Sequence, residues 1–305
     1  MASPLTIAEF SDLLDPRFRE IWDGKFAQGR DLVPMLHTMV TPTQLTERWS
    51  ALTGMGLFSE FTGTIAYDGP DEGYDGSSTA KEYAKGMIIE RLLMEYDQFG
   101  KVETMFDLLA ESAFDSYQEE AIQSLVQGFV IDSGFTRTEG VALFSDSHTS
   151  PRSGVSTTVG FDNLTTSELS PLTLKALRIQ ARRFKKDNGQ PIPNFMLDTI
   201  YGPPDLEDRA AEITRTVDGL DSAEGTTNVL KGKFKFVSIE RFTDTNDYFV
   251  VNQAALKKNC LWFEKVKPEY SKIEDFDGIK AKCRGYYIIH RGVKDWRVGI
   301  GASVS

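Results

Sequence analysis

The sequence predicts an α+β protein, and three observations lead to that prediction. Residues 101–129 carry the strongest helical pattern in the chain. Residues 217–305 contain a series of strand-like segments, and a glycine-rich stretch at 54–80 precedes the long helix. Helices and strands that are grouped in separate parts of a chain are typical of an α+β fold.

The pattern at 101–129 is that of one long amphipathic helix. Apolar side chains recur at spacings of three and four residues, and Gln, Glu, Asp and Ser occupy the opposite face. At 1.5 Å per residue the helix is roughly 43 Å long, much longer than the usual globular helix. We expect it to serve as a strut. Its apolar positions are Met105, Leu108, Leu109, Ala113, Tyr117, Ala121, Leu125 and Phe129.

The glycine-rich stretch predicts an extended excursion without a core of its own. Six glycines lie between residues 54 and 80, and an acidic run occupies 68–75. Strand-like segments at 61–67 and 87–96 flank the acidic run, so we expect a two-stranded ribbon with a polar tip. A two-stranded ribbon is only marginally stable in water. Something outside its own domain should therefore cover it.

The other elements follow from periodicity and capping. The first thirty residues are expected to form an amphipathic arm that is interrupted by Pro16. A second helix is expected to begin with Ser170 as its N-cap and to end at Asn188–Gly189. Asp205 is expected to cap a third helix, which runs to about Thr214. The expected strands are 195–200, 234–239, 248–251, 261–266, 279–289 and 296–300.

Composition and charge restrict the function classes. With 40% hydrophobic and 26% charged residues, the 305-residue chain has the composition of a folded globular protein. Its net charge of −11 excludes histone-like DNA binding, which requires many cations at the phosphates. An acidic protein can still enclose DNA, because a container must not adhere to its contents. No secretory signal or membrane-spanning run is found, and the two cysteines suit a reducing compartment.

No set of residues has the spacing of a catalytic or metal site. The three histidines, His37, His148 and His290, are far apart and form no metal-binding motif. His148 is interpreted as an ordinary loop residue. We expect no catalytic residue, no cofactor and no bound metal ion.

Two charged clusters have structural interpretations. Asp205, Glu207 and Asp208 fall in the first turn of a predicted helix, where negative charge complements the helix dipole. The basic run 182–186 falls at a predicted helix end, where positive charge is favourable. A nucleic-acid contact is the alternative interpretation of that run.

Several short motifs occur in an order that is found in one protein family. Together with the order of the elements, they resemble the Hong Kong 97-type major capsid proteins of tailed bacteriophages, most closely the Mu-like major head subunit family. The resemblance extends over nearly the whole chain. Its motifs are Leu143-Phe144 with His148, Asn163-Leu164, Lys186-Asp187-Asn188-Gly189, Pro204-Asp205-Leu206-Glu207, Phe276–Tyr286 and Asp295–Gly301.

The resemblance implies a fold with an N-terminal arm, an extended β loop, a spine helix, and peripheral and axial domains. It implies a major capsid protein that self-assembles into an icosahedral shell around phage double-stranded DNA, in the virion, after assembly in the cytoplasm of the host. The expected boundaries are 1–53 for the arm and lead-in strand, 54–98 for the extended β loop, 99–150 for the spine helix and the start of the peripheral domain, 151–250 mostly for the axial domain, and 251–305 for return strands shared by both domains.

The implied partners are other copies of the chain in hexamers and pentamers, a portal, and a decoration protein as a further candidate. No cleavable scaffold-like extension is recognised at the N-terminus, so a separate scaffolding protein is implied. The DNA is enclosed without sequence-specific binding, and no membrane is involved. Crosslinking between copies is not predicted.

Contacts between copies are expected from the ribbon, the arm and the long helix. The ribbon should lie across the long helix of a neighbouring copy, and the arm should add a second strap. Such heterologous contacts close into rings when the rotation permits it. Deletion of 64–84 is expected to leave a folded monomer that does not assemble. The residues expected at the contacts are Trp22, Phe26, Ile65, Tyr67, Tyr74, Tyr83, Ile88 and Tyr117.

Three alternatives stay open. An encapsulin-like nanocompartment would share the fold but enclose enzymes. A hydrolase that uses carboxylates such as Asp205 and Asp208 would have a concave acidic pocket. A decoration or tail-tube protein is expected to be mostly β, which fits the long helix poorly.

Overall fold

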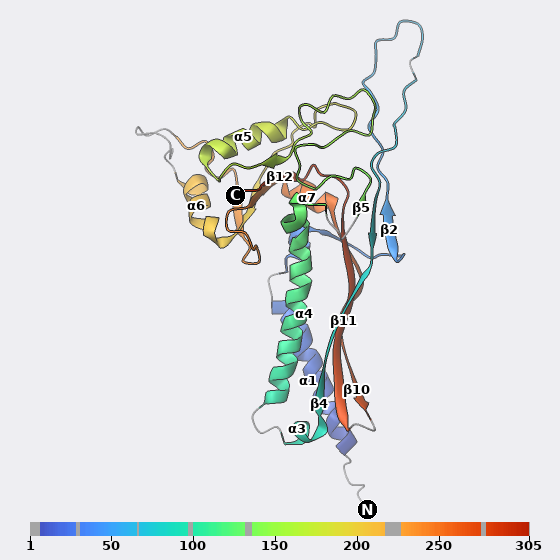
Figure 1. Ribbon diagram of the computed structural model, residues 1–305, viewed down its shortest axis with the longest axis vertical. Helices are drawn as coiled ribbons and strands as arrows, with labels where there is room; N and C mark the ends of the chain where they lie inside the picture. The colour runs from blue at the N-terminus through green and yellow to red at the C-terminus, as the bar shows by residue number, and fades with distance from the viewer. Residues whose placement is uncertain are drawn as a thin grey trace, which may run out of the picture.

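The computed structural model describes residues 7–28, 31–65, 67–96, 100–131, 136–216, 227–275 and 279–304. The chain forms a narrow stalk, a broader head at one end of the stalk, and an extended loop (residues 53–74) that projects from the head (Figure 1). Parts of three predicted segments lie outside the described residues: 1–6 of the arm, 97–98 of the ribbon and 276–278 of one motif.

The stalk is built on a four-stranded sheet in the order β1–β10–β11–β4. β10 (Cys260–Asp275) and β11 (Lys280–Val293) form a long antiparallel hairpin, and β4 (Lys81–Glu90) pairs antiparallel with β11. β1 (Thr38–Val40) pairs in parallel with the start of β10. The hairpin register shifts on both sides of Val266, close to Pro268, which has no N–H to donate. Both predicted strands of this hairpin are confirmed, and both are longer than predicted.

Two helices pack on the stalk. α4 (Lys101–Val126), followed by the 3-10 turn η1 (Gln127–Phe129), is the long helix that the sequence predicts. α1 (Ile7–Gln28) lies beside α4 and includes Pro16 (Figure 1). None of the described helices is both long enough and apolar enough to span a membrane.

Much of the apolar face of α4 is covered within the subunit, and a contact of its exposed part with the ribbon of a neighbouring copy stays a prediction. Phe106 stacks on Phe18 of α1 with ring centroids 3.5 Å apart. Tyr117 packs edge-on against Trp262 of β10, at a centroid distance of 5.1 Å. Among the predicted apolar positions of α4, only Leu108 is classed as exposed. The pattern therefore identified the buried face in part. Leu109, Tyr117, Ala121 and Leu125 are buried as predicted, whereas the buried Val102, Phe106, Ala110 and Ile122 were not predicted.

The head contains a five-stranded sheet in the order β6–β12–β9–β7–β8. All residues of the three central strands are buried. Strands buried on both faces form continuous apolar runs, as in the predicted strand Tyr248–Val251. The strands are β6 (Leu164–Thr165), β12 (Gly299–Ala302), β9 (Tyr248–Val251), β7 (Thr199–Gly202) and β8 (Lys235–Ser238).

Two predicted strands of the head begin later than the sequence pattern indicates. The predictions at 195–200 and 296–300 correspond to β7 and β12, which begin at Thr199 and Gly299. Phe195 and Trp296 are buried but precede the strands. Their apolar character therefore made the strands appear to begin earlier in the sequence pattern.

The helices of the head confirm one predicted cap and correct another. The Ser170 hydroxyl accepts a hydrogen bond from the Thr173 N–H (3.1 Å) at the start of α5 (Pro171–Arg182). α5 ends at Arg182 rather than at Asn188–Gly189. Asp205 does not cap the third helix, because it lies in a 3-10 turn, η2 (Pro204–Leu206), that precedes α6 (Glu207–Arg215). Two further helices are α2 (Val33–Leu36) and α7 (Gln253–Asn259).

The predicted two-stranded ribbon is not formed. Residues 61–65 and 67 belong to no strand, and 87–90 are the end of β4, which pairs with β11 and is followed by α3 (Arg91–Glu95). Ile89 is buried in the stalk core, so this segment packs against apolar side chains of its own subunit. β3 (Gly76–Thr79) joins a small sheet with β2 (Thr46–Trp49) and β5 (Thr136–Arg137). The part that projects is therefore the extended loop.

Replacing Gly285 of β11 with valine should separate α1 from the sheet. A Cβ atom at Gly285 would lie 2.3 Å from Trp22 Cη2, and the Trp22 indole also donates to the Pro268 carbonyl (3.1 Å). We expect a loss of about 1–3 kcal/mol in the free energy of unfolding, measured by urea denaturation. Gly24→Ala in α1 is the control, because no atom lies within 4 Å of its added Cβ. Equal stability of the two variants would contradict the packing of α1 on β11.

Candidate functional site

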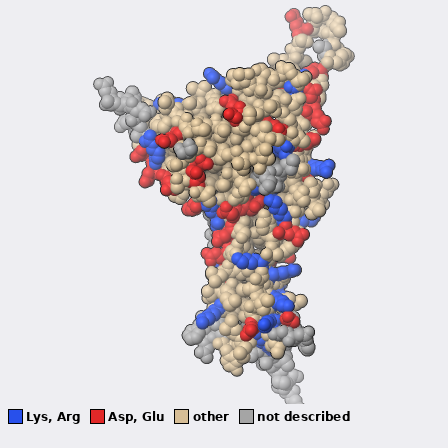
Figure 2. Space-filling model, viewed as in Figure 1, with Lys and Arg blue, Asp and Glu red and all other residues tan. Residues whose placement is uncertain are grey.

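The tip of the extended loop carries a cluster of exposed apolar side chains. Leu57, Phe58, Phe61, Ile65 and Tyr67 are each at least 62% exposed, and Phe58 is completely exposed. In the space-filling view the tip projects from the head as a mostly uncharged knob, with Asp and Glu gathered on the neck below it (Figure 2). Exposed apolar surface of this extent marks a site of interaction with another molecule.

The base of the extended loop is held by hydrogen bonds between its outgoing and returning halves. The Gly73 N–H donates to the Ala51 carbonyl (2.7 Å), and the Thr53 N–H donates to the Asp71 carbonyl (2.9 Å). Farther out, the Gly56 N–H donates to the Asp68 carboxylate (2.8 Å). A Cβ atom at residue 73 would lie 2.8 Å from the Ala51 oxygen, so glycine is required for this close approach.

Arg152 joins both halves of the base to the head. Its Nη1 donates to the Gly54 carbonyl (2.9 Å) on the outgoing half, and its Nη2 donates to Asp68 Oδ1 (2.9 Å) on the returning half. Asp71 Oδ2 lies 3.5 Å from Arg152 Nε. A guanidinium presents its donors in a rigid planar fork, so one side chain can fix the angle between two segments. The hydrogen bond from Gly56 and the charge of Arg152 hold the pKa of Asp68 below its usual value.

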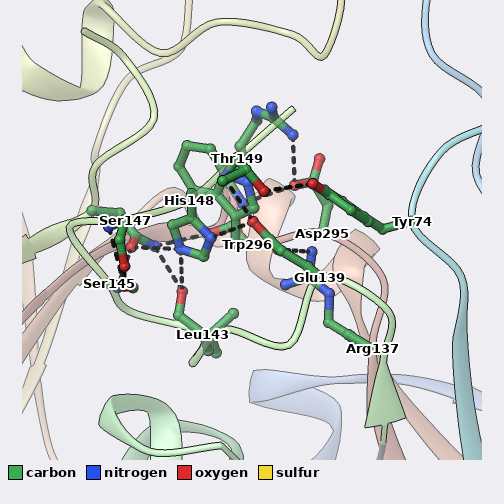
Figure 3. A network of polar contacts seen from close by, with 12 residues as sticks. Tyr74, Arg137, Glu139, Leu143, Ser145, Ser147, His148, Thr149, Asp295 and Trp296 are labelled. Atoms are coloured by element: carbon green, nitrogen blue, oxygen red, sulfur yellow. Dashed lines mark hydrogen bonds and ion pairs between the residues drawn. The ribbon is translucent and has the colours of Figure 1, made fainter. Parts of the chain in front are cut away.

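Tyr74 connects the end of the extended loop to a buried polar network (Figure 3). The Tyr74 and Thr149 hydroxyl oxygens are 2.5 Å apart, and the Thr149 N–H donates to Glu139 Oε1 (3.1 Å). The same Glu139 oxygen lies 2.9 Å from His148 Nδ1, and the other oxygen lies 2.8 Å from Arg137 Nη2. The direction of the loop is thereby coupled to a group of buried ionisable side chains.

His148 is the centre of this network rather than an ordinary loop residue, which corrects the sequence interpretation. Its ring stacks on Trp296 with a centroid distance of 4.2 Å and an interplanar angle of 7°. Its Nε2 faces the Leu143 carbonyl (3.2 Å) and Asn163 Oδ1 (3.1 Å). Both ring nitrogens therefore lie within hydrogen-bond distance of acceptor oxygens. The motif Leu143-Phe144 with His148 was the sequence signal for this residue.

The environment of Glu139 favours its ionised form. Burial alone would raise the pKa of Glu139. The hydrogen bond and charge of His148, together with the charge of Arg137, outweigh burial and hold the pKa of Glu139 below its usual value. The carboxylate is thus a fixed acceptor that orders the Thr149 backbone beside the loop.

Four of the eight predicted contact residues, Ile65, Tyr67, Tyr74 and Ile88, belong to neither hydrophobic cluster of the subunit, and Tyr83 packs at the edge of one. Ile65 and Tyr67 lie on the tip, and Ile88 is exposed on β4 in the stalk. Tyr74 is half-buried in the network at the base of the loop. Tyr83 is half-buried and stacks on Tyr287 of the same chain, with centroids 5.0 Å apart.

Trp22, Phe26 and Tyr117 pack within the subunit. Trp22 and Tyr117 are buried, and the half-buried Phe26 packs edge-on against Tyr117 at a centroid distance of 6.1 Å. Their role at contacts between copies stays a prediction.

The charged clusters considered in the sequence do not converge on a catalytic arrangement. Asp205, Glu207 and Asp208 are exposed at the start of α6. No group of three or more His, Cys, Asp or Glu among the described residues could hold a metal ion. In the basic run 182–186, Phe184 is fully buried against Trp296, so its ring cannot stack on a nucleic-acid base.

No protein-family model matches the sequence, and no curated protein matches it. Solved structures match in fold. A structure from Mycobacterium phage Patience matches with a TM-score of 0.61 and 10% identity, over 100% of this chain and 90% of the other. The chain has a phage capsid fold.

Two further structures support that conclusion. The capsid of the empty GTA particle has a TM-score of 0.56 and 10% identity, over 91% of each chain. The capsid of Myoviridae phage XM1 has a TM-score of 0.53 and 12% identity, over 88% of this chain and 90% of the other. The predicted Hong Kong 97-type fold is confirmed, and α4 corresponds to its predicted long spine helix. The closer match to the Mu-like family and the domain boundaries stay predictions.

Arg152→Ala should loosen the base of the extended loop without unfolding the head. The two halves of the base lose their shared cation, so we expect the Thr53, Gly56 and Asp71 amides to exchange hydrogen at least about threefold faster. Arg209→Ala, which removes an exposed ion pair with Glu212 on α6, is the control. Unchanged exchange at the base in Arg152→Ala would show that the backbone ladder alone fixes the loop.

Glu139→Gln should remove a component of stability that depends on pH. Because the folded pKa of Glu139 is below the unfolded pKa, its ionised form stabilises the fold above the unfolded value. That contribution is lost as the pH falls through the folded pKa. Thermal unfolding should show wild type more stable than Glu139→Gln at pH 7, with the difference shrinking below about pH 4.5. A difference that stays constant down to pH 3 would contradict this role.

Proposed function

We propose that this chain is the major capsid protein of a tailed bacteriophage, which self-assembles into an icosahedral shell around double-stranded DNA. The exposed apolar tip of the extended loop carries the proposal. Burial of one large apolar side chain contributes about 1.5–3 kcal/mol. Five such side chains on one projecting tip can therefore drive association, even after the entropic cost of binding is subtracted.

The geometry of the tip favours contacts between unlike surfaces. The tip projects away from its own stalk and head, so the surface that receives it belongs to another copy (Figure 1). A contact in which one patch meets a different patch generates rings when the rotation closes. Hexamers and pentamers of the chain are the rings proposed for the shell.

Further partners are part of the proposal. A separate scaffolding protein, a portal and a decoration protein are the candidates, and the assembled protein resides in the virion. The net charge of −11 is compatible with a shell that encloses DNA without binding specific DNA sequences.

The alternatives receive less support. An encapsulin-like shell would share the fold, but no observation on this chain favours an enzyme as cargo. The hydrolase alternative relied on Asp205 and Asp208, which are exposed in η2 and at the start of α6.

Replacing Leu57–Tyr67 with a short Gly-Ser linker should abolish shells while leaving the subunit folded. The replaced residues lie beyond Arg152 and the hydrogen-bonded base, so the head and stalk keep their contacts. Negative-stain microscopy and sedimentation should show particles for wild type and monomers for the variant, with unchanged circular dichroism. Val229→Ser, a change at another exposed apolar residue, is the control and should form shells. Normal shells from the linker variant would contradict the assembly role of the tip, and a wild-type chain that forms no particles would refute the proposed function.

Deletion of 64–84 does not serve this purpose. It would remove β3, which belongs to the small sheet with β2 and β5, and part of β4, which belongs to the four-stranded sheet of the stalk. Loss of assembly in that variant would follow from unfolding.

A further inference from the structure

Helix α5 presents a second surface that the extended loop does not explain. α5 lies at the outer edge of the head (Figure 1), with Leu174, Leu177 and Ala181 buried beneath it. Its outward side combines positive charge with exposed aliphatic side chains.

The cations of α5 are unpaired in an otherwise acidic protein. Lys175, Arg178 and Arg182 follow one another at spacings of three and four, which places them in a row along the helix. Arg183 adds a fourth cation at the end. Within the described part of the chain, none of the four forms an ion pair, and α5 itself contains no acidic residue. The guanidinium of Arg182 instead contacts Met196 Sδ at 3.7 Å.

An aliphatic strip runs beside this row. Leu172 is 73% exposed and Ile179 is 56% exposed. They are seven residues apart, so they lie on the same side of the helix. Met196 is exposed next to Arg182 and extends the apolar surface.

The two features together select one kind of partner. The cationic row requires a negatively charged partner, and the aliphatic strip requires a partner with apolar side chains at helical spacing. A DNA backbone supplies the charge but not the apolar side chains, and the aromatic residue that follows Arg183, Phe184, is buried. A helix with an apolar stripe flanked by carboxylates supplies both. The outward face, from residue 172 to 183, is roughly 16 Å long, which matches about three turns of such a helix.

We propose that the outward face of α5 binds an acidic amphipathic helix of a separate assembly partner, such as the scaffolding protein. The proposal rests on the proposed function for the class of partner, because only a shell subunit requires one. The binding surface itself belongs to the single subunit and can be measured without a shell.

The probe is a fluorescent 15-residue peptide with leucines along one helical face and glutamates on both sides. An isomer of the same composition, with the leucines spread around the helix, is the peptide control. Fluorescence anisotropy with the full chain should show the amphipathic peptide binding at least about tenfold more tightly than the isomer.

Two double variants test the two features of the surface. Lys175→Glu with Arg182→Glu, and Leu172→Ser with Ile179→Ser, should each weaken peptide binding by at least about fivefold. Lys257→Glu with Lys258→Glu, on exposed positions of α7, is the matched charge control and should bind normally. The linker variant of the extended loop should also bind normally, so failure of the shell proposal and failure of this one are distinguishable.

Four outcomes of the binding measurements, and one outcome of shell assembly, would overturn the proposal. They are no binding of the amphipathic peptide, equal binding of the isomer, and unchanged binding after the Leu172 and Ile179 substitutions. The fourth is a 20-base-pair DNA duplex that binds as tightly as the peptide and displaces it, which would make α5 a nucleic-acid surface. Loss of shells by Lys175→Glu with Arg182→Glu, in a preparation that contains this chain alone, would instead assign α5 to a contact between copies and would also overturn it.

Discussion

The packing of α4 against α1 and the β10–β11 hairpin determines much of the rest of the structure. Phe18, Trp22, Phe106 and Tyr117 close the stalk core within one subunit. This packing buries most of the apolar face of the longest helix within one subunit. The tip of the extended loop projects from the head, away from this core, and is exposed in a single subunit. A stalk with a buried core and a loop tip with exposed apolar side chains are together the physical basis of the assembly proposal.

The extended loop differs in character between its base and its tip. The base is fixed by a backbone ladder, by Arg152 and by the link from Tyr74 to the buried His148 network. The tip contributes apolar side chains and has few contacts of its own. A loop that is directed in advance loses less conformational entropy when it binds. Polar contacts at the base thus fix the direction of the loop, whereas burial of the apolar tip side chains provides the free energy of association.

The sequence predicted the elements whose signal is local. The apolar repeat of 101–129 identified α4, and Ser170 identified the start of α5. The sequence could not predict partners that are distant in the chain. Segments 61–67 and 87–96 both have strand-like composition, but only the stalk core shows that Ile89 pairs with Ala281. The pattern around Trp22 and Tyr117 predicts an apolar face, but it does not show whether the same subunit or another copy covers that face. The His148 network joins Tyr74, Glu139 and Trp296, and no periodicity connects residues so far apart.

The acidic neck of the extended loop has a consequence for the solution conditions of assembly. Asp68, Asp71, Glu72 and Asp75 lie within eight consecutive residues, and Arg152 contacts only Asp68 and Asp71 among them. When several necks approach one another in a ring, their exposed carboxylates, such as that of Glu72, repel. At 0.1 M ionic strength the screening length is about 10 Å, so added salt weakens this repulsion between exposed groups. The rings should therefore close more readily in moderate salt than in dilute buffer, in contrast to an association driven by opposite charges.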